Sequence, residues 1–171
     1  DGADVREIRA DGAAGVADLV TGDAGAFASF EVLFAVRSVA NGDDFVVVDA
    51  RNATHPITSA LAKRMGDRHR GVGFNQLAVM LDCDDAQARV VFWNADGSAL
   101  DTCGSATRGV AERLMRESNS TSVILRTNRG LLTCEQTTSG AITVSMGEPL
   151  LSWSQIPLAT ALDSLRLPLA G

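Results

Sequence analysis

The residues best suited to chemistry lie around Cys103, between a polar turn and a stretch with helical periodicity. The turn, Asn-Ala-Asp-Gly-Ser, begins at Asn94, and the periodic stretch begins at Gly104. The first N–H groups of a helix lack intrahelical partners at the positive end of its dipole, so a thiolate or a carboxylate is stabilised there. Gly104 and Ser105 leave this backbone approachable, and Asn94 can present its amide across the turn. A thiol base beside a carboxylate-binding helix start suits removal of a proton from the carbon next to that carboxylate.

The same cysteine also has a structural interpretation, because a cysteine near a helix start is more often a small, buried, apolar residue. The other two cysteines, Cys83 and Cys134, fall just after and within predicted strands, where packing explains them better than catalysis. Three cysteines are an odd number without metal-ligand spacing, which indicates free thiols in a reducing compartment.

Two further polar clusters have milder interpretations. His69 lies among charged residues, and a solvated or structural role is favoured over a catalytic one. Asp82, Asp84 and Asp85 resemble part of a cation site, but the full ligand spacing of a calcium loop is missing. A solvated acidic turn is favoured there, and no metal site is predicted.

The candidate residues depend on strands and helices that the hydrophobic pattern predicts. Short apolar runs separated by polar turns predict strands at 30–36, 45–50, 76–81, 89–93, 122–126, 131–135 and 141–146. The last three suit antiparallel hairpins, because Asn-Arg-Gly and Ser-Gly turns separate them. Helices are predicted over 60–65, capped by Thr58 or Ser59 and ended by Gly66, and over about 104–116. The apolar face of the second helix comprises Val110, Ala111, Leu114 and Met115.

Composition limits the classes of protein to which this chain can belong. With 171 residues, 46% of them hydrophobic, it can bury one core, and we expect one folded domain. A net charge of -6 with scattered Lys and Arg residues argues against nucleic acid and anionic membranes as partners. No apolar run approaches the roughly 20 residues that span a bilayer, and the start does not resemble a signal peptide. We therefore expect a soluble, cytoplasmic protein.

Four motifs, in order along the chain, are similar to those of diaminopimelate epimerases. Residues 41–49 (Asn-Gly-Asp-Asp-Phe-Val-Val-Val-Asp) resemble the family's opening Gly-Asn-Asp-Phe motif. Residues 67–77 resemble its Asp-Arg-His-x-Gly-(Ile/Val)-Gly-Phe-Asp-Gln, and residues 92–98 its Phe-x-Asn-Ala-Asp-Gly-Ser. Residues 103–108 resemble its Cys-Gly-Asn-(Gly/Ala)-x-Arg. Residues 127–130 and 144–149 also fit, and residues 153–158 resemble the alphaproteobacterial form.

The resemblance implies a fold, a reaction and a set of site residues. The implied fold is α+β, one half of a pseudo-symmetric pair, with an antiparallel, β-barrel-like sheet around a central helix. The implied reaction converts LL- to meso-diaminopimelate, for lysine and peptidoglycan synthesis, through two cysteines on opposite faces of the α-carbon and without a cofactor. Cys103 would be the acid/base of this half, and backbone amides of Gly104 and Ser105 would help to hold the carboxylate. The implied substrate-contacting positions are Asp43, Gln76, Asn94 and Ser105.

Departures from the family pattern bear on activity. The chain carries one half of the pattern, so the second cysteine would come from a carboxy-terminal half or from a second copy of this chain. Asp43 and Ser105 stand where the family has Asn, Asn75 where it has Asp, and Gly109 where it usually has Cys. An Asn-to-Asp change adds a negative charge and removes two N–H donors, so altered or weakened binding is expected. The alternatives are therefore a non-catalytic binding module and a homodimer with an altered substrate.

The resemblance also divides the chain into segments. Residues 1–29 are rich in Ala, Gly and Asp and are expected to form an extension or linker. Residues 30–150 correspond to the epimerase-type domain. Residues 151–171 are proline-containing and are expected to connect toward a second domain. Because the face that receives that domain would be apolar, we expect the chain to associate with itself or with the other half.

Overall fold

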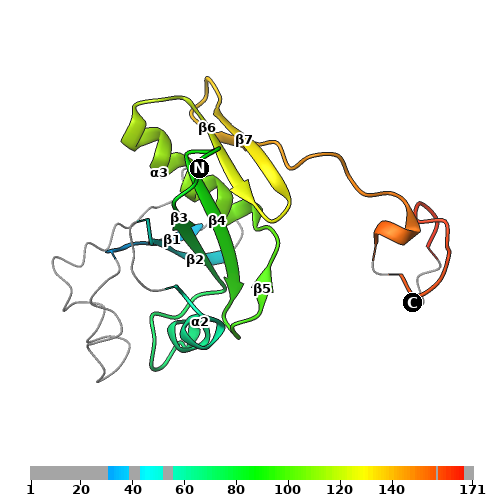
Figure 1. The fold of residues 1–171 in the computed structure, drawn as a ribbon, viewed down its shortest axis with the longest axis horizontal. Coiled ribbons are helices and arrows are strands. Elements are labelled where there is room, and N and C mark those ends of the chain that lie inside the picture. Colours follow the sequence, from blue (N-terminus) through cyan, green and yellow to red (C-terminus); the bar gives the residue numbers. More distant parts are fainter. Residues whose placement is uncertain (1–30, 39–42, 52–55, 157, 168–171) are drawn as a thin grey trace.

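A curled sheet and two helices make up most of the part of the chain that the structure describes (Figure 1). The structure is a computed structural model that describes residues 31–38, 43–51, 56–156 and 158–167. The predicted amino-terminal extension lies outside these residues. The strands are β1 (Glu31–Ser38), β2 (Asp43–Asp49), β3 (Gln76–Leu81), β4 (Ala88–Asn94), β5 (Ala99–Leu100), β6 (Ser122–Thr127), β7 (Gly130–Gln136) and β8 (Ile142–Val144). The helices are α2 (Ser59–Gly66), α3 (Gly104–Ser118) and the short 3-10 helix η1 (Trp153–Gln155).

The sheet has the order β1-β2-β3-β4-β6-β7-β8, and β5 pairs with β4 beside this path. Most neighbouring pairs are antiparallel, as expected, but β2–β3 and β4–β6 are parallel. The α+β class and the curled half-barrel with a central helix are confirmed, whereas the expectation of an antiparallel sheet is corrected to a mixed one. Each parallel pair requires a crossover, and α2 and α3 lie within the two crossover connections.

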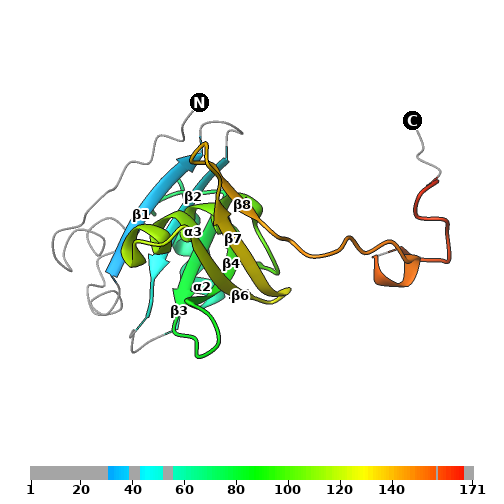
Figure 2. The same cartoon turned by 90° about the horizontal axis from the view of Figure 1, so that it is seen from above.

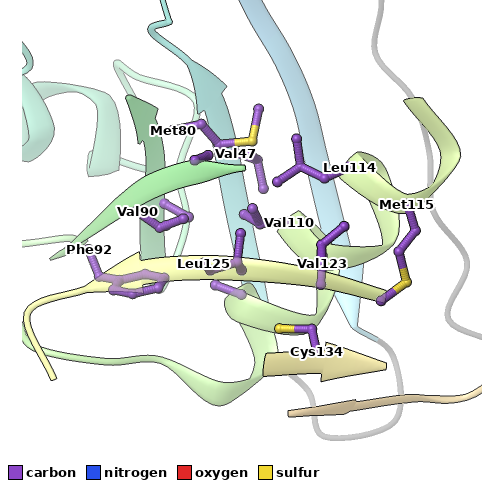
Figure 3. Packing of buried hydrophobic residues seen from close by; sticks show 14 of the residues in the cluster. Val47, Met80, Val90, Phe92, Val110, Leu114, Met115, Val123, Leu125 and Cys134 are labelled. Atoms are coloured by element: carbon purple, nitrogen blue, oxygen red, sulfur yellow. The ribbon is translucent and has the colours of Figure 1, made fainter. Parts of the chain in front are cut away.

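Both faces of the sheet are covered, and each helix has its own core. In β2, Phe45 and Val47 pack on the α3 side, whereas Val46 and Val48 pack on the α2 side. This alternation follows from the two-residue repeat of a strand. The predicted apolar face of α3 is confirmed. It packs among residues of β2, β3, β4, β6 and β7, and α3 lies close to the inner face of the sheet (Figures 2 and 3).

Local sequence signals fix the ends of the helices. Thr58 caps α2, because its side chain accepts a hydrogen bond from the Leu61 backbone N–H at 3.3 Å, as predicted. Helix α3 extends beyond the predicted Arg116 to Ser118, and the left-handed backbone of the next residue, Asn119 (φ 49°), closes the last turn.

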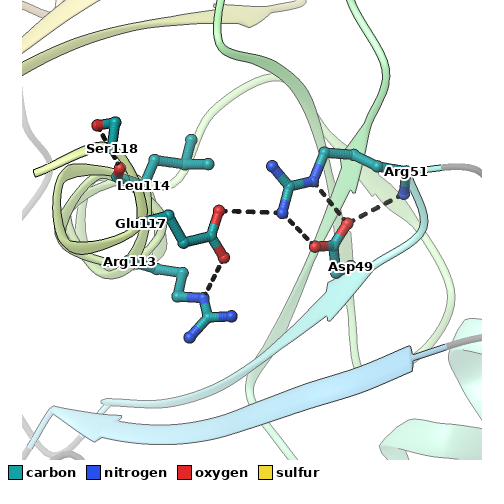
Figure 4. A network of polar contacts seen from close by, with 6 residues as sticks. All are labelled: Asp49, Arg51, Arg113, Leu114, Glu117 and Ser118. Atoms are coloured by element: carbon teal, nitrogen blue, oxygen red, sulfur yellow. Dashed lines mark hydrogen bonds and ion pairs between the residues drawn. The ribbon is translucent and has the colours of Figure 1, made fainter.

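An ionic network joins the far half of α3 to the end of β2 (Figure 4). Arg51 donates from Nε to Asp49 Oδ1 (2.8 Å) and from Nη2 to Glu117 Oε2 (3.1 Å). Glu117 also pairs with Arg113 one turn earlier, at 2.5 Å. Hydrogen bonds from Arg51 to Asp49 raise the pKa of the guanidinium further above its ordinary range. The network therefore holds α3 along β2.

Beyond β8 the chain leaves the sheet. Ser145 donates its backbone N–H to the Thr133 carbonyl at 2.9 Å, and the following segment runs away from the sheet toward η1 (Figures 1 and 2). Several large apolar side chains of this segment are exposed: Met146, Leu150, Leu151, Trp153, Leu162 and Leu165. Among the described residues, no helix is long and apolar enough to cross a membrane.

Candidate active site

Three strands present polar residues at one end of the sheet. Strands β2 and β3 are parallel and begin at this end, and the antiparallel β4 finishes there. In this register Phe45 pairs with Gln76, and Gln76 pairs with Asn94. Two of the predicted substrate residues, Gln76 and Asn94, are therefore direct cross-strand neighbours. Asp43 is the first residue of β2, and its side chain lies outside what the structure describes.

The direction of α3 brings Cys103 to the same end of the sheet. Gly109 lies against the ring of Phe45, near the start of β2. Glu117, two turns later, bonds to Arg51, just after the end of β2. Helix α3 therefore runs in the same direction as β2, and its first turn lies where β2 and β3 begin.

Cys103 is the residue immediately before α3, with extended backbone angles (φ -145°, ψ 107°). Its carbonyl accepts hydrogen bonds from the Thr107 N–H (2.9 Å) and hydroxyl (2.7 Å), which fix the first turn. The thiol is half-buried against the α3 core. In the described chain, no side chain caps this helix start. Among the described residues, nothing lies within 4 Å of the position that a Cβ atom at Gly104 would take, so the space beside Gly104 is open.

The turn after β4 holds the Asn94 amide in place. Asn94 donates from Nδ2 to the Ser98 hydroxyl (2.9 Å), and that hydroxyl donates to Asp96 Oδ1 (2.6 Å). The hydrogen bonds from Ser98 lower the pKa of the Asp96 carboxyl below its ordinary value. Gly97 has φ +84°, and a Cβ there would lie 2.4 Å from the Ser59 carbonyl, so only glycine fits. The turn is thereby packed against the start of α2.

Among the described residues, the buried polar atoms without a hydrogen-bond partner include Oε1 of Gln76 and the hydroxyl oxygen of Thr102, next to Cys103. Leaving such a group unpaired typically costs about 1–3 kcal/mol, so these atoms are suited to meeting a ligand. Thr102 was not predicted as a site residue, although its place directly before Cys103 was a usable signal.

The loop before β3 contributes a contact that the sequence interpretation also missed. Arg68 makes a two-pronged hydrogen bond to Asp44 (2.7 and 2.8 Å) and reaches Asn75 Oδ1 (2.7 Å). His69 is exposed, and its backbone N–H bonds to Asp67, which agrees with the solvated role predicted for it.

The other two cysteines lie away from this end. Cys134 is fully buried in the α3 core, and burial raises the pKa of its thiol to about 11. Cys83 follows the far end of β3 and donates to Asp85 Oδ1 at 3.0 Å. The packing role predicted for Cys134 is confirmed. Within the described ranges, no group of three or more His, Cys, Asp or Glu residues is arranged to hold a metal ion.

Comparison with known proteins places the chain in a family. The sequence model for diaminopimelate epimerase matches residues 35–151. The chain is 45% identical over 130 residues to the diaminopimelate epimerase of Rhodospirillum centenum, covering 74% of this chain and 44% of that protein. It is 45% identical over 129 residues to that of Acidiphilium cryptum, covering 75% and 47%.

The chain thus spans a little under half the length of these two relatives. A solved PhzF-family phenazine biosynthesis protein of Bacillus anthracis aligns with a TM-score of 0.45 at 23% identity, covering 60% of this chain and 34% of its own. The match to the family model and the identity to the two relatives confirm the expected family: the chain belongs to the diaminopimelate epimerase family.

Proposed function

We propose that this chain forms the Cys103-bearing half of an epimerase site for diaminopimelate. The observation that carries the proposal is the start of α3, which no described side chain caps and where the half-buried Cys103 thiol precedes Gly104, a residue with open space beside it. Family membership supports the choice of substrate. By this proposal the chain acts in the cytoplasm in the synthesis of lysine and peptidoglycan precursors, with no cofactor.

The proposed chemistry begins at the Cys103 sulfur. The thiolate takes the proton from the substrate α-carbon, and the C–H electron pair moves into the adjacent carboxylate. Backbone N–H groups of Gly104 and Ser105 stabilise the charge that develops on the carboxylate oxygens. A thiol on the opposite face then donates a proton to the carbanion, and configuration is inverted.

Polar groups at the strand ends would orient the rest of the substrate. Gln76 brings an unpaired acceptor oxygen, and Asn94 brings an amide held by Ser98. An ammonium group is a suitable donor for the Gln76 oxygen. The family motif also implies Asp43 as a substrate-contacting residue, and a carboxylate in that role would favour a cationic part of the substrate.

The thiol for the opposite face would come from a partner. Cys134 is fully buried in the core and Cys83 follows the far end of β3, so neither suits this role. A second half of the same fold is our proposal for the partner, and a second copy of this chain is the alternative. The exposed apolar side chains beyond β8 favour association, because such surface usually marks an interface.

Protection of cysteines by substrate tests this proposal. The chain is treated with iodoacetamide, with and without LL-diaminopimelate, and the labelled cysteines are identified by mass spectrometry. We expect the substrate to slow labelling of Cys103 and to leave Cys83, the matched control thiol, unchanged. Equal labelling rates at Cys103 with and without substrate would contradict the proposal. Protection that survives the loss of Gln76 and Asn94 would contradict their assigned roles.

A further inference from the structure

A half-exposed arginine in the loop before β3 is held by two independent features of the structure. The guanidinium of Arg68 forms its fork with the Asp44 carboxylate and donates a third hydrogen bond to Asn75. Gly73 packs against its aliphatic stem: with φ +73°, a Cβ there would lie 3.0 Å from Arg68 Cα and 3.0 Å from Cγ. Arg68 is therefore built into the loop even though its side chain is 50% exposed.

Asp44 and Asn75, which Arg68 binds, join three segments of the site through backbone hydrogen bonds. The Asn75 N–H donates to the Asp44 carbonyl (2.8 Å), and the Asn75 carbonyl accepts from the Ala95 N–H (3.2 Å). Asn75 thereby ties the start of β2, the start of β3 and the turn after β4. Arg68 adds a charged bridge between Asp44 and Asn75 across the same junction.

The two residues that Arg68 binds are each followed in the chain by a residue of the site or by the strand partner of one. Asp44 precedes Phe45, Asn75 precedes Gln76, and Phe45 and Gln76 are paired in the parallel register. A displacement of Asn75 would also move the side-chain amide of Gln76, because the two residues are adjacent in the chain. The Asp44 carboxylate already pairs with this guanidinium at 2.7 Å, which argues against a second role for Arg68 in binding the substrate carboxylate.

We propose that Arg68 is a positioning residue that fixes Gln76 and Asn94 for ligand binding and does not itself bind the substrate carboxylate. This inference rests on the function proposed above. Lysine keeps the charge but cannot form the planar fork. Arg68→Lys and Arg68→Gln should therefore perturb the site to a similar extent.

The test uses the full 171-residue chain labelled with nitrogen-15. Without ligand, both variants should shift the side-chain amide signals of Gln76 and Asn94. Hydrogen exchange at the backbone amides of Asn75 and Ala95 should accelerate by about 3- to 10-fold, the range that one half-exposed, charge-assisted pair supports. Affinity for LL-diaminopimelate should fall alike in both variants. The Gln76 and Asn94 signals are assigned by their loss in Gln76→Glu and Asn94→Asp.

Two control variants separate positioning from charge and from stability. Arg70→Gln removes an exposed positive charge from the same loop and should leave both amide signals in place. Arg51→Gln breaks the Asp49 pair at the other end of β2, so it should lower stability without moving these signals.

Either of two results would overturn the proposal in favour of direct substrate contact. The first is that the amide signals of Gln76 and Asn94 do not shift in Arg68→Lys. The second is that Arg68→Lys still binds the substrate whereas Arg68→Gln does not. The ligand-free signals need no substrate, so they decide the role of Arg68 even if diaminopimelate does not bind. Absence of binding to the wild-type chain would instead refute the proposed function.

Discussion

A single substitution in α3 measures how closely the helix approaches the sheet. Gly109 lies in the interior of α3, where alanine normally stabilises a helix by about 1 kcal/mol relative to glycine. A Cβ at this position would lie 2.8 Å from Cε2 and 2.9 Å from Cζ of Phe45. Phe45 is only 2% exposed and has little room to move, and overpacking of this kind costs about 1–3 kcal/mol. Gly109→Ala should therefore destabilise the chain by up to about 2 kcal/mol.

The effect of Gly109→Ala on stability should change sign when the Phe45 ring is removed. Leucine at position 45 lacks the two ring atoms that the new methyl group would meet, so in a Phe45→Leu background Gly109→Ala should stabilise by up to about 1 kcal/mol. Urea unfolding followed by far-UV circular dichroism measures both values. Gly104→Ala is the matched control in the same helix, because its Cβ meets nothing, and its effect should be equal in both backgrounds. A stabilising Gly109→Ala in the wild-type chain would refute the close approach of α3 to Phe45.

Two further predictions concern the reactivity of the cysteines and the ion pair of Asp85. Ellman's reagent at pH 8 should react quickly with Cys83 and Cys103 but with Cys134 only after unfolding in urea, because burial raises the Cys134 pKa to about 11; three fast thiols in the folded chain would contradict this. Hydrogen bonds from Arg126 and Cys83 lower the Asp85 pKa to about 2, so its contribution to stability is complete above the ordinary value of 3.8 and is lost as the pH falls toward 2. The difference in urea midpoint between the wild-type chain and Asp85→Asn should shrink over that range, and a difference independent of pH would argue against the pair.

Local patterns were sufficient to predict most elements. Strand β3 has the predicted bounds, and α2 has the predicted cap at Thr58. These predictions succeed because apolar periodicity and turn residues act over a few neighbouring residues. The two-residue strand β5 was missed, since Ala99 and Leu100 carry no strand signal of their own and pair only because the turn at Gly97 directs them back along β4.

Contacts between distant segments could not be predicted in the same way. The parallel β2–β3 and β4–β6 pairs depend on crossovers that bring separate segments together, and no local pattern encodes that choice. The interpretation of His69 gave no role to the neighbouring Arg68, because the partner of Arg68, Asp44, lies 24 residues earlier. The motifs predicted Cys103, Gln76 and Asn94 as site residues, but only the register makes Gln76 and Asn94 neighbours.

Deuterium uptake at the α-carbon tests the central claim most directly. The chain is incubated with LL-diaminopimelate in heavy water, and Cys103→Ser serves as the control, with Cys83→Ser as the matched thiol variant. A Cys103 thiol that takes the α-proton and exchanges with solvent should return deuterium to the same face. We expect uptake that depends on Cys103, persists in Cys83→Ser, and inverts configuration only when a second thiol faces the substrate. Uptake that persists in Cys103→Ser, or a folded chain that shows none, would contradict the role of Cys103 as the acid/base.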